Sequence, residues 1–63
     1  MEYPCKIKEK TYGPHIYMEL YTKSGMHGEI DVYLRESGTS FKTSADNDMK
    51  QRNEIINAFL DLY

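Results

Sequence analysis

Hydrophobic and polar residues alternate with a period of two along the first two-thirds of the chain. The alternation is clearest from His15 to Lys23, where every second side chain is apolar or threonine. It recurs over residues 5–11 and 29–36, and the segments in between contain Gly13-Pro14 and Gly25. A period of two is typical of a half-buried strand, and Gly and Pro mark the turns between strands. The pattern therefore predicts three antiparallel strands at about 5–11, 15–23 and 29–36, joined as a meander.

The last third of the chain has the period of a helix. Thr43 and Asp46 have the spacing of a capping box, and Asp48 adds a second acid where the helix dipole favours negative charge. Apolar residues then recur along one broad stripe, so we expect an amphipathic helix over about 44–62. Residues 40–43, which include Phe41, fit either a short fourth strand or a loop.

A sheet with one apolar face needs a cover, and the predicted helix is the only element available for it. The expected fold is α+β: a small two-layer sandwich with a three-stranded antiparallel meander followed by one C-terminal helix (β-β-β-α). Residues 1–63 are expected to form a single domain. The expected core packs sheet residues against one side of the helix and consists of Cys5, Ile7, Ile16, Met18, Leu20, Ile30, Val32, Leu34, Phe41, Met49, Ile56, Phe59 and Leu60.

Length and charge narrow the classes of function. A domain of 63 residues hides only about 60% of the surface of its unfolded chain, so a partner or a second copy is a natural additional support. Cys5 is the single cysteine, which excludes an internal disulfide. With no cleavable apolar leader and no run of about 20 apolar residues, the sequence predicts a cytoplasmic chain. The formal charge of −2 disfavours a globally basic nucleic-acid binder.

Catalytic and metal chemistry find little support in the sequence. His27 and Glu29 flank Gly28, but the paired spacings of zinc sites are absent, and Gln51 stands where a calcium loop after Asp46 would need glycine. Cys5 is followed by Lys6, yet neighbouring residues of a strand point to opposite faces, so we expect Cys5 to be an inert core residue. The predictions are therefore no enzyme activity, no metal and no cofactor.

The solvent side of the predicted sheet is rich in tyrosine, which presents a large contact area with few rotatable bonds. This pattern favours a protein-binding module, an inhibitor or regulator that acts by covering a partner's surface. Tyrosines would be its anchors, and charged residues would steer the partner and fix its register. The predicted contact residues are Tyr17, Glu19, Tyr21, Asp31, Tyr33 and Arg35. The alternative interpretation is that these tyrosines only stabilise the exposed sheet through cross-strand pairs.

Two other functions remain open at this stage. The first is binding of a single-stranded nucleic acid on the same face, with bases stacked on the tyrosines. The phosphates would then lie on the first strand and its end, at Lys6, Lys8, Lys10 and Tyr12. Glu19, Glu29 and Asp31 on that face argue against it. A homodimer is the third possibility, closed either by the tyrosine face or by a ridge of Ile55 and Leu62 at the margin of the helix stripe.

The β-β-β-α layout, the slightly acidic balance and the short length together resemble the small accessory inhibitors and antitoxins that phages and mobile elements carry. The resemblance is one of size and layout. It implies a binding protein without catalytic activity.

Overall fold

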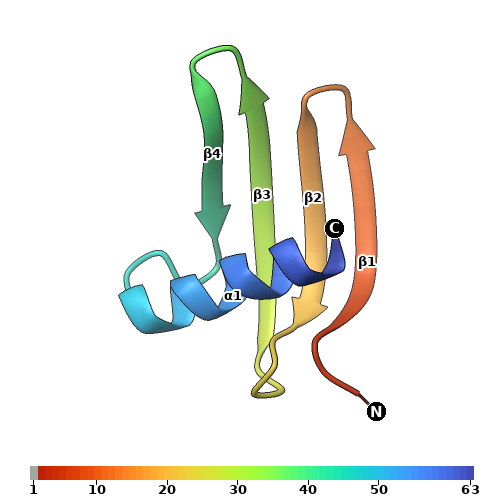
Figure 1. Cartoon of the computed structure of the whole chain (residues 1–63), viewed down its shortest axis with the longest axis vertical. Coiled ribbons are helices and arrows are strands. Elements are labelled where there is room, and N and C mark those ends of the chain that lie inside the picture. Colours follow the sequence, from red (N-terminus) through yellow and green to blue (C-terminus); the bar gives the residue numbers. More distant parts are fainter. Residues whose placement is uncertain (1) are drawn as a thin grey trace.

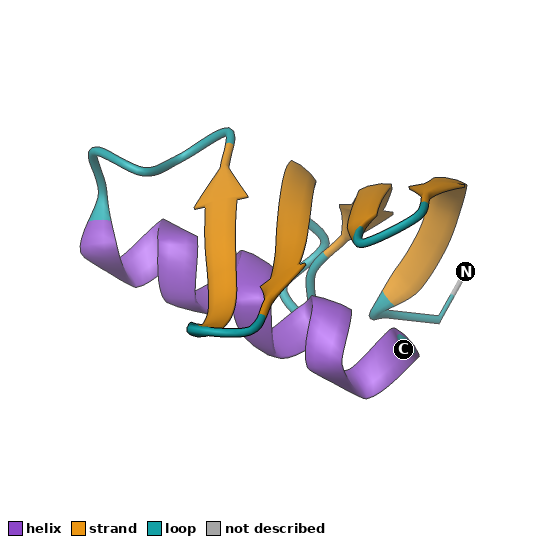
Figure 2. Ribbon diagram, turned by 90° about the horizontal axis from the view of Figure 1, so that it is seen from above, coloured by secondary structure: helices purple, strands orange, loops and turns teal. Residues whose placement is uncertain are grey.

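The protein is a small α+β fold in which one helix packs on one face of an antiparallel sheet (Figures 1 and 2). The computed structural model describes residues 2–63. The strands are β1 (Cys5–Tyr12), β2 (His15–Tyr21), β3 (His27–Arg35) and β4 (Gly38–Thr43), and the helix is α1 (Met49–Leu62). The strands lie in the order β1-β2-β3-β4. The α+β class and the meander with a C-terminal helix are as predicted, but the sheet has four strands rather than three.

Residues 40–43 belong to a fourth strand, β4, and not to a loop. It pairs antiparallel with β3, from Arg35 opposite Gly38 to Ile30 opposite Thr43. Gly38, at the start of β4, has a φ of 127°, which L side chains rarely adopt, and this allows the tight turn from β3. The strand has few large apolar residues, because it lies at the edge of the sheet and only Phe41 and Thr43 turn toward the core. Because this apolar pattern is weak, the sequence by itself did not distinguish a fourth strand from a loop at residues 40–43.

An irregularity in β1 overturns the predicted faces of its first residues. The register between β1 and β2 shifts between Lys6 and Lys8, so one extra residue, Ile7, is inserted as a bulge. Cys5 stands opposite Tyr21 and therefore lies on the solvent side of the sheet, half-buried, rather than in the core. Lys6 stands opposite Leu20, on the helix side, and Ile7 is 45% exposed. A bulge reverses the alternation, which the period of two alone does not reveal.

The helix begins later than predicted. Its N-cap is Asp48, whose carboxylate accepts a hydrogen bond from the backbone N–H of Gln51 at 3.2 Å, so helical residues start at Met49 instead of about 44. Thr43 and Asp46 do interact, but in the turn before the helix. The backbone N–H and the hydroxyl of Thr43 both donate to Asp46 Oδ1, at 2.8 and 2.7 Å. The predicted capping box is thus a turn motif that connects β4 to α1.

The buried core differs from the predicted one on the helix side. Ile55 and Ala58 are almost completely buried, together with Phe59, whereas Met49 and Leu60 are 71% and 60% exposed. On the sheet side, Leu34 is 46% exposed. Cys5 and Ile7 are also outside the core, whereas Ile16, Met18, Leu20, Ile30 and Val32 are buried as predicted. Thr22 and Ala45, which follow strands β2 and β4, are buried as well. Within residues 2–63 the buried apolar residues are Ile16, Met18, Leu20, Ile30, Val32, Ala45, Ile55, Ala58 and Phe59. Phe41 and Ile56 pack against this core while remaining half-exposed.

The position of the helix explains these differences. In Figure 1, α1 crosses the sheet close to the β2–β3 turn and leaves the ends of the β1–β2 and β3–β4 hairpins uncovered. Gly28 permits its close approach to β3: a Cβ atom there would lie 2.7 Å from Ile55 Cγ1. Residues near the uncovered hairpin ends, such as Leu34, therefore keep exposed apolar surface although they lie on the helix side.

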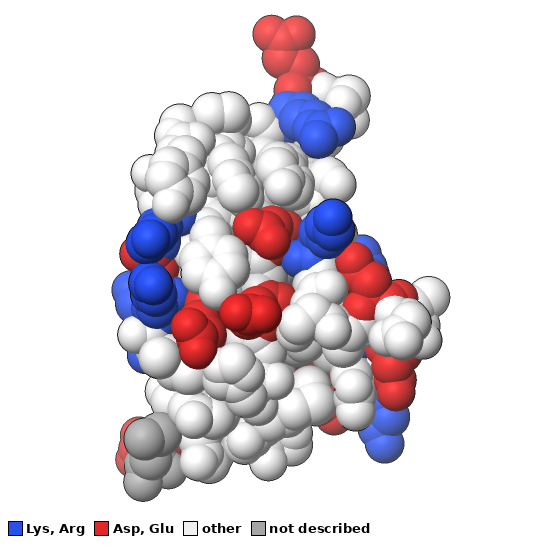
Figure 3. Space-filling view, turned by 180° about the vertical axis from the view of Figure 1, so that it is seen from behind, with Lys and Arg blue, Asp and Glu red and all other residues white. Residues whose placement is uncertain are grey.

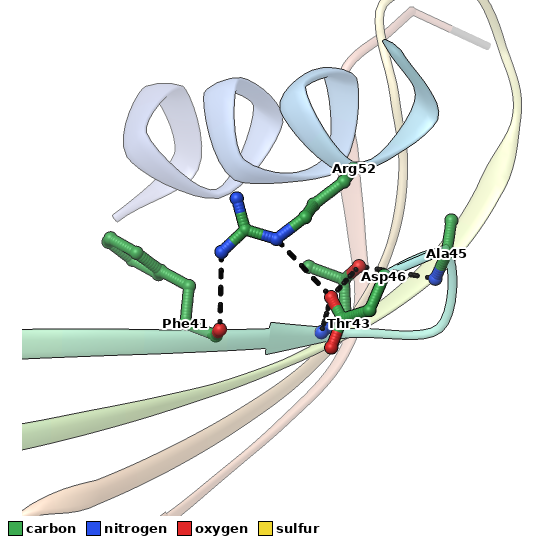
Figure 4. Close-up of polar contacts among 5 residues, drawn as sticks. All are labelled: Phe41, Thr43, Ala45, Asp46 and Arg52. Atoms are coloured by element: carbon green, nitrogen blue, oxygen red, sulfur yellow. Dashed lines mark hydrogen bonds and ion pairs between the residues drawn. The ribbon is translucent and has the colours of Figure 1, made fainter. Parts of the chain in front are cut away.

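The edge of β4 is closed by polar contacts from the turn and the helix (Figure 4). Arg52 Nη2 donates to the backbone carbonyl of Phe41 at 3.4 Å, and Arg52 Nε lies 3.4 Å from Asp46 Oδ1. Asp46 in turn accepts from the backbone N–H of Thr43. The Phe41 carbonyl and the Thr43 N–H, on the edge of β4 that faces away from β3, thus have hydrogen-bond partners. This protects that end of the strand from pairing with another chain.

The contacts of Asp46 with Thr43 and Arg52 make the free energy of unfolding depend on pH. The hydrogen bonds from the side chain and the backbone of Thr43, aided by Arg52, hold the pKa of the Asp46 carboxyl below its ordinary value of 3.8. The unfolded chain therefore binds this proton at a higher pH than the folded chain does. We expect the stabilisation to be complete above about pH 5 and to be lost as the pH falls through the folded pKa. Urea unfolding midpoints of the wild type and Asp46→Asn, measured from pH 6 to pH 2, test this.

The expected result is that the difference between the two proteins shrinks as the pH falls below the ordinary value of 3.8, because Asp46 becomes protonated in the wild type. Asp61→Asn serves as the control, since Asp61 pairs with Lys23 at the other end of the helix. A difference between wild type and Asp46→Asn that stays constant across this pH range contradicts the assignment.

Candidate functional site: the outer face of the sheet

The sheet face opposite the helix carries all the predicted contact residues. Alternation within β2 and β3, together with their register, places His15 beside Tyr33, Tyr17 beside Asp31, Glu19 beside Glu29 and Tyr21 beside His27. Arg35 continues this face at the end of β3. We call this surface the outer face; it comprises His15, Tyr17, Glu19, Tyr21, His27, Glu29, Asp31, Tyr33 and Arg35.

At the end of the outer face near the β1–β2 turn, aromatic rings form a stack. His15 and Tyr33 lie with ring centroids 4.5 Å apart and planes at 4°, and Tyr12 stacks on the same imidazole at 5.8 Å. The guanidinium of Arg35 lies 5.3 Å from the centroid of the Tyr33 ring, in cation–π geometry. His15 Nε2 lies 2.7 Å from Asp31 Oδ1, which fixes the orientation of the imidazole in the stack.

A second cluster of rings occupies the opposite end of the face. Tyr21 contacts Tyr3 on one side and His27 on the other, each with a centroid separation of 5.7 Å. His27 Nε2 lies 2.7 Å from Glu19 Oε1. At each end of the face, a tyrosine ring thus contacts a histidine, and a ring nitrogen of that histidine contacts a carboxylate from the adjacent strand.

Three carboxylates, those of Glu19, Glu29 and Asp31, lie between the two clusters. Figure 3 shows acidic atoms gathered in the middle of this face, basic atoms at its two sides and uncharged surface above and below. The Tyr17 hydroxyl donates to Glu29 Oε1 at 2.9 Å. This hydrogen bond, then the loss of hydration and the neighbouring carboxylate charges, raises the pKa of Tyr17 to about 12 from 10.0. The centre of the outer face is therefore a region of negative potential.

The Tyr17 hydroxyl provides a direct test of this electrostatic arrangement. Glu29→Gln removes the charged acceptor, so we expect the pKa of Tyr17 to fall from about 12 toward its ordinary value of 10.0. NMR titration of the Tyr17 ring resonances between about pH 8 and pH 13 measures it. Lys50→Gln, on the helix, is the control variant. An unchanged Tyr17 titration in Glu29→Gln contradicts the contact.

The basic residues surround the acidic centre. Lys8 and Lys10 stand opposite Glu19 and Tyr17 in the register, and Lys42 stands opposite Asp31 on β4, so all three flank the outer face. Lys6 does not join this row: the bulge turns it to the helix side, where its ammonium pairs with Glu9 at 2.9 Å. The predicted row of three lysines on one face is wrong for Lys6. Tyr12 extends the outer face, stacked on His15.

The metal pair considered from sequence, His27 and Glu29, is not assembled. His27 contacts Glu19, and Glu29 accepts from Tyr17. Within residues 2–63 the structure brings together no group of three or more His, Cys, Asp or Glu side chains that could hold a metal ion. Cys5 lies at the edge of the face beside Tyr21, contrary to the predicted core position.

The contributions of His15, His27 and Tyr3 to this face are not evident from the sequence. The alternation placed His15 on the solvent side, but the pairing of each histidine with a carboxylate depends on the β2–β3 register, which spacing along one strand does not provide. Tyr3 precedes β1 and has no periodic signal; its ring is brought to Tyr21 by the chain's path before the sheet.

The fold and this face define a small α+β domain with an open, aromatic and acidic sheet surface. Comparison with known proteins yields no matching family model, no matching curated protein and no matching solved structure. Across residues 2–63, α1 is too short and too polar to cross a membrane.

Proposed function

We propose that this chain is a cytoplasmic, non-enzymatic protein-binding module, an inhibitor or regulator that covers a partner's surface with its outer face. The module is of the type that phages and mobile elements carry as accessory proteins. Tyr17, Tyr21 and Tyr33 are its anchors, and Glu19, Asp31 and Arg35 orient the partner. The observation that carries the proposal is the arrangement of two ring clusters around three carboxylates on a face that no helix or strand of residues 2–63 covers.

Preorganisation supports this proposal. Binding normally costs free energy because interface side chains lose rotational freedom, about 0.5–1.5 kcal/mol for each flexible one. The rings of Tyr21 and Tyr33 are already held by stacking, and the Tyr17 hydroxyl by Glu29. These tyrosines therefore offer contact area with little further loss of freedom on binding.

The carboxylates support the same proposal, because two of them face each other across neighbouring strands. Glu19 and Glu29 stand directly opposite each other on neighbouring strands, an arrangement of like charges that destabilises a sheet. His27 and Tyr17 offset part of this repulsion. A cationic side chain of a protein partner would offset the remainder, and the negative potential would speed its approach.

Single-stranded nucleic acid is the alternative ligand of this face. Lys8 and Lys10 flank Tyr17, which is suited to a phosphate beside a stacked base. The three carboxylates at the centre would repel the backbone, so the proposal favours a protein. Affinity for an oligonucleotide would fall steeply with added salt, which distinguishes the two ligands.

Affinity capture from native cell extract, with and without nuclease, tests the function. We expect the wild type to retain a protein partner after nuclease treatment, and Tyr21→Ala/Tyr33→Ala to lose at least about 90% of it, as expected when two anchors are removed. Arg35→Glu, at an exposed position, is a second variant that reduces capture without removing a packed ring.

Lys50→Ala/Gln51→Ala on the exposed side of α1 is the matched control and should capture as the wild type does. Circular dichroism establishes that each bait is folded. Equal capture by the wild type and by both outer-face variants contradicts the proposal, and capture that disappears with nuclease favours the nucleic-acid alternative.

A further inference from the structure

The two edges of the sheet differ in how their backbone groups are bonded. β1 and β4 are the edge strands, and in Figure 1 β1 is the outermost element on its side of the sheet. On β4, the Phe41 carbonyl accepts from Arg52, and the Thr43 N–H donates to Asp46. On β1, no side chain or loop of the described chain forms a hydrogen bond with the outward backbone groups of residues 8–12. This part of β1 is therefore an open edge.

The strand register identifies these outward groups. In an antiparallel sheet, successive residues direct their N–H and C=O groups alternately to the two sides of the strand. Phe41 directs its carbonyl away from β3, so Val32 opposite it bonds to β2, and Ile16 opposite Val32 bonds to β3. Thr11 stands opposite Ile16 and therefore directs its N–H and C=O away from β2. Glu9, two residues earlier, does the same.

The bulge in β1 sets the length of the open edge. Ile7 is the extra residue, and one-to-one pairing with β2 runs from Lys8 to Tyr12. Residues of an antiparallel strand are spaced by about 3.4 Å, so this stretch offers about 17 Å of regular backbone. We call residues 8–12 the β1 edge. It is long enough for a partner strand of about five residues.

Charge determines which kind of strand fits the β1 edge. Lys8 and Lys10 lie exposed on its outer-face side, and the ion pairs of residues 2–63 include neither ammonium. Glu9, on the opposite side, is already paired with Lys6 at 2.9 Å. A second copy of β1 bonded through both Glu9 and Thr11 would place the two Lys10 side chains directly opposite each other, which destabilises a sheet. An acidic strand would instead place carboxylates opposite the lysines.

We propose that the β1 edge binds an extended acidic segment of another protein, which joins the sheet as an additional strand beside β1. The backbone of the segment bonds to Glu9 and Thr11, and Asp or Glu at alternate positions face Lys8 and Lys10. In this mode of recognition, main-chain hydrogen bonds provide affinity and alternate side chains provide specificity. Lysines on an edge strand hinder pairing with a like strand but favour an acidic one. The β1 edge is a second binding surface, and it does not require the tyrosines of the outer face.

NMR titration of the full chain with a synthetic peptide tests the proposal. The probe is a blocked peptide of about seven residues in which glutamate alternates with threonine and valine, added up to about 2 mM. We expect the amide resonances of Glu9 and Thr11 to shift and their hydrogen exchange to slow, because both N–H groups gain acceptors. The amide of Thr39, on the other edge strand, should not change. A peptide with lysine in place of glutamate should bind at least about tenfold more weakly.

Two variants separate the contribution of charge from that of the backbone. Lys8→Gln/Lys10→Gln should weaken binding of the acidic peptide about fivefold or more, whereas Lys42→Gln/Lys50→Gln, with the same change in net charge, should bind as the wild type does. Thr11→Pro removes an outward N–H that pairing with β2 does not use. It should weaken binding at least about threefold, the effect of one lost hydrogen bond. Circular dichroism establishes that each variant is folded.

An acidic peptide that shifts no amide of residues 8–12 overturns the proposal, and so does equal affinity for the wild type and Lys8→Gln/Lys10→Gln. Shifts of these amides with single-stranded oligothymidylate, but not with the peptide, also overturn it and assign the two lysines to phosphate binding. Tyr21→Ala/Tyr33→Ala should bind the peptide as the wild type does. The result for the β1 edge is therefore independent of whether the outer face binds a partner.

Discussion

Replacing Ile55 by Ala is expected to lower the free energy of unfolding by about 2–5 kcal/mol, the usual cost of deleting a large core side chain. Ile55 is completely buried and lies on the side of α1 that faces β3, against Gly28. Its removal leaves a cavity beneath the helix, which is the only element that covers the core of residues 2–63. Urea unfolding followed by circular dichroism measures the effect.

Leu60→Ala is the matched control for Ile55→Ala. Leu60 is 60% exposed, so in the monomer its truncation should change the free energy of unfolding by no more than about 0.5 kcal/mol. A larger effect for Leu60→Ala than for Ile55→Ala would mean that the helix presents a different side to the sheet.

Gly28→Ala is the second large effect that we expect, with a loss of about 1–3 kcal/mol for an overpacked core position. A Cβ at position 28 would lie 2.7 Å from Ile55 Cγ1 and 2.9 Å from Ile55 Cδ1, so the helix or the Ile55 side chain must shift. Gly28 has no unusual φ that would by itself require glycine. The expected loss therefore results from the close approach of α1. Urea unfolding of the variant and the wild type measures it.

A double-mutant cycle separates this cause from a general weakening of β3. Ile55→Val deletes Cδ1, one of the two closest atoms, so Gly28→Ala should cost less in the Ile55→Val background than in the wild type. Thr39→Ala, at an exposed position of β4, is the control for a strand substitution without a clash. Strict additivity of Gly28→Ala and Ile55→Val contradicts direct contact as the source of the effect.

Local patterns predicted the parts of the fold that depend on the neighbouring residues in the chain. The alternation in β2 and β3 is uninterrupted, so Ile16, Met18, Leu20, Ile30 and Val32 were correctly assigned to the core. The bulge in β1 contradicts the simple period, and β4 has too few apolar residues to show one. In both cases the pairing with a neighbouring strand decides the structure, and that pairing is not visible in one segment.

For the outer face as well, local patterns predicted one part of the structure and strand pairing decided the rest. Sequence alternation put the tyrosines and carboxylates on the solvent side of β2 and β3, and the register agrees. The contacts that hold the rings, such as His15 on Tyr33 and His27 against Glu19, join residues from different strands. They follow from the offset between β2 and β3, so they could not be predicted from either strand by itself.

The amino-acid sequence by itself determined the α+β fold class, because the periods of two and 3.6 depend only on local backbone geometry. It also determined which face of β2 and β3 is polar. The tertiary structure decided where the helix crosses the sheet, and hence that Ile55 is buried while Leu34, Met49 and Leu60 are exposed. The reason is that one helix covers only part of a four-stranded sheet, and the contact of Gly28 with Ile55 selects which part.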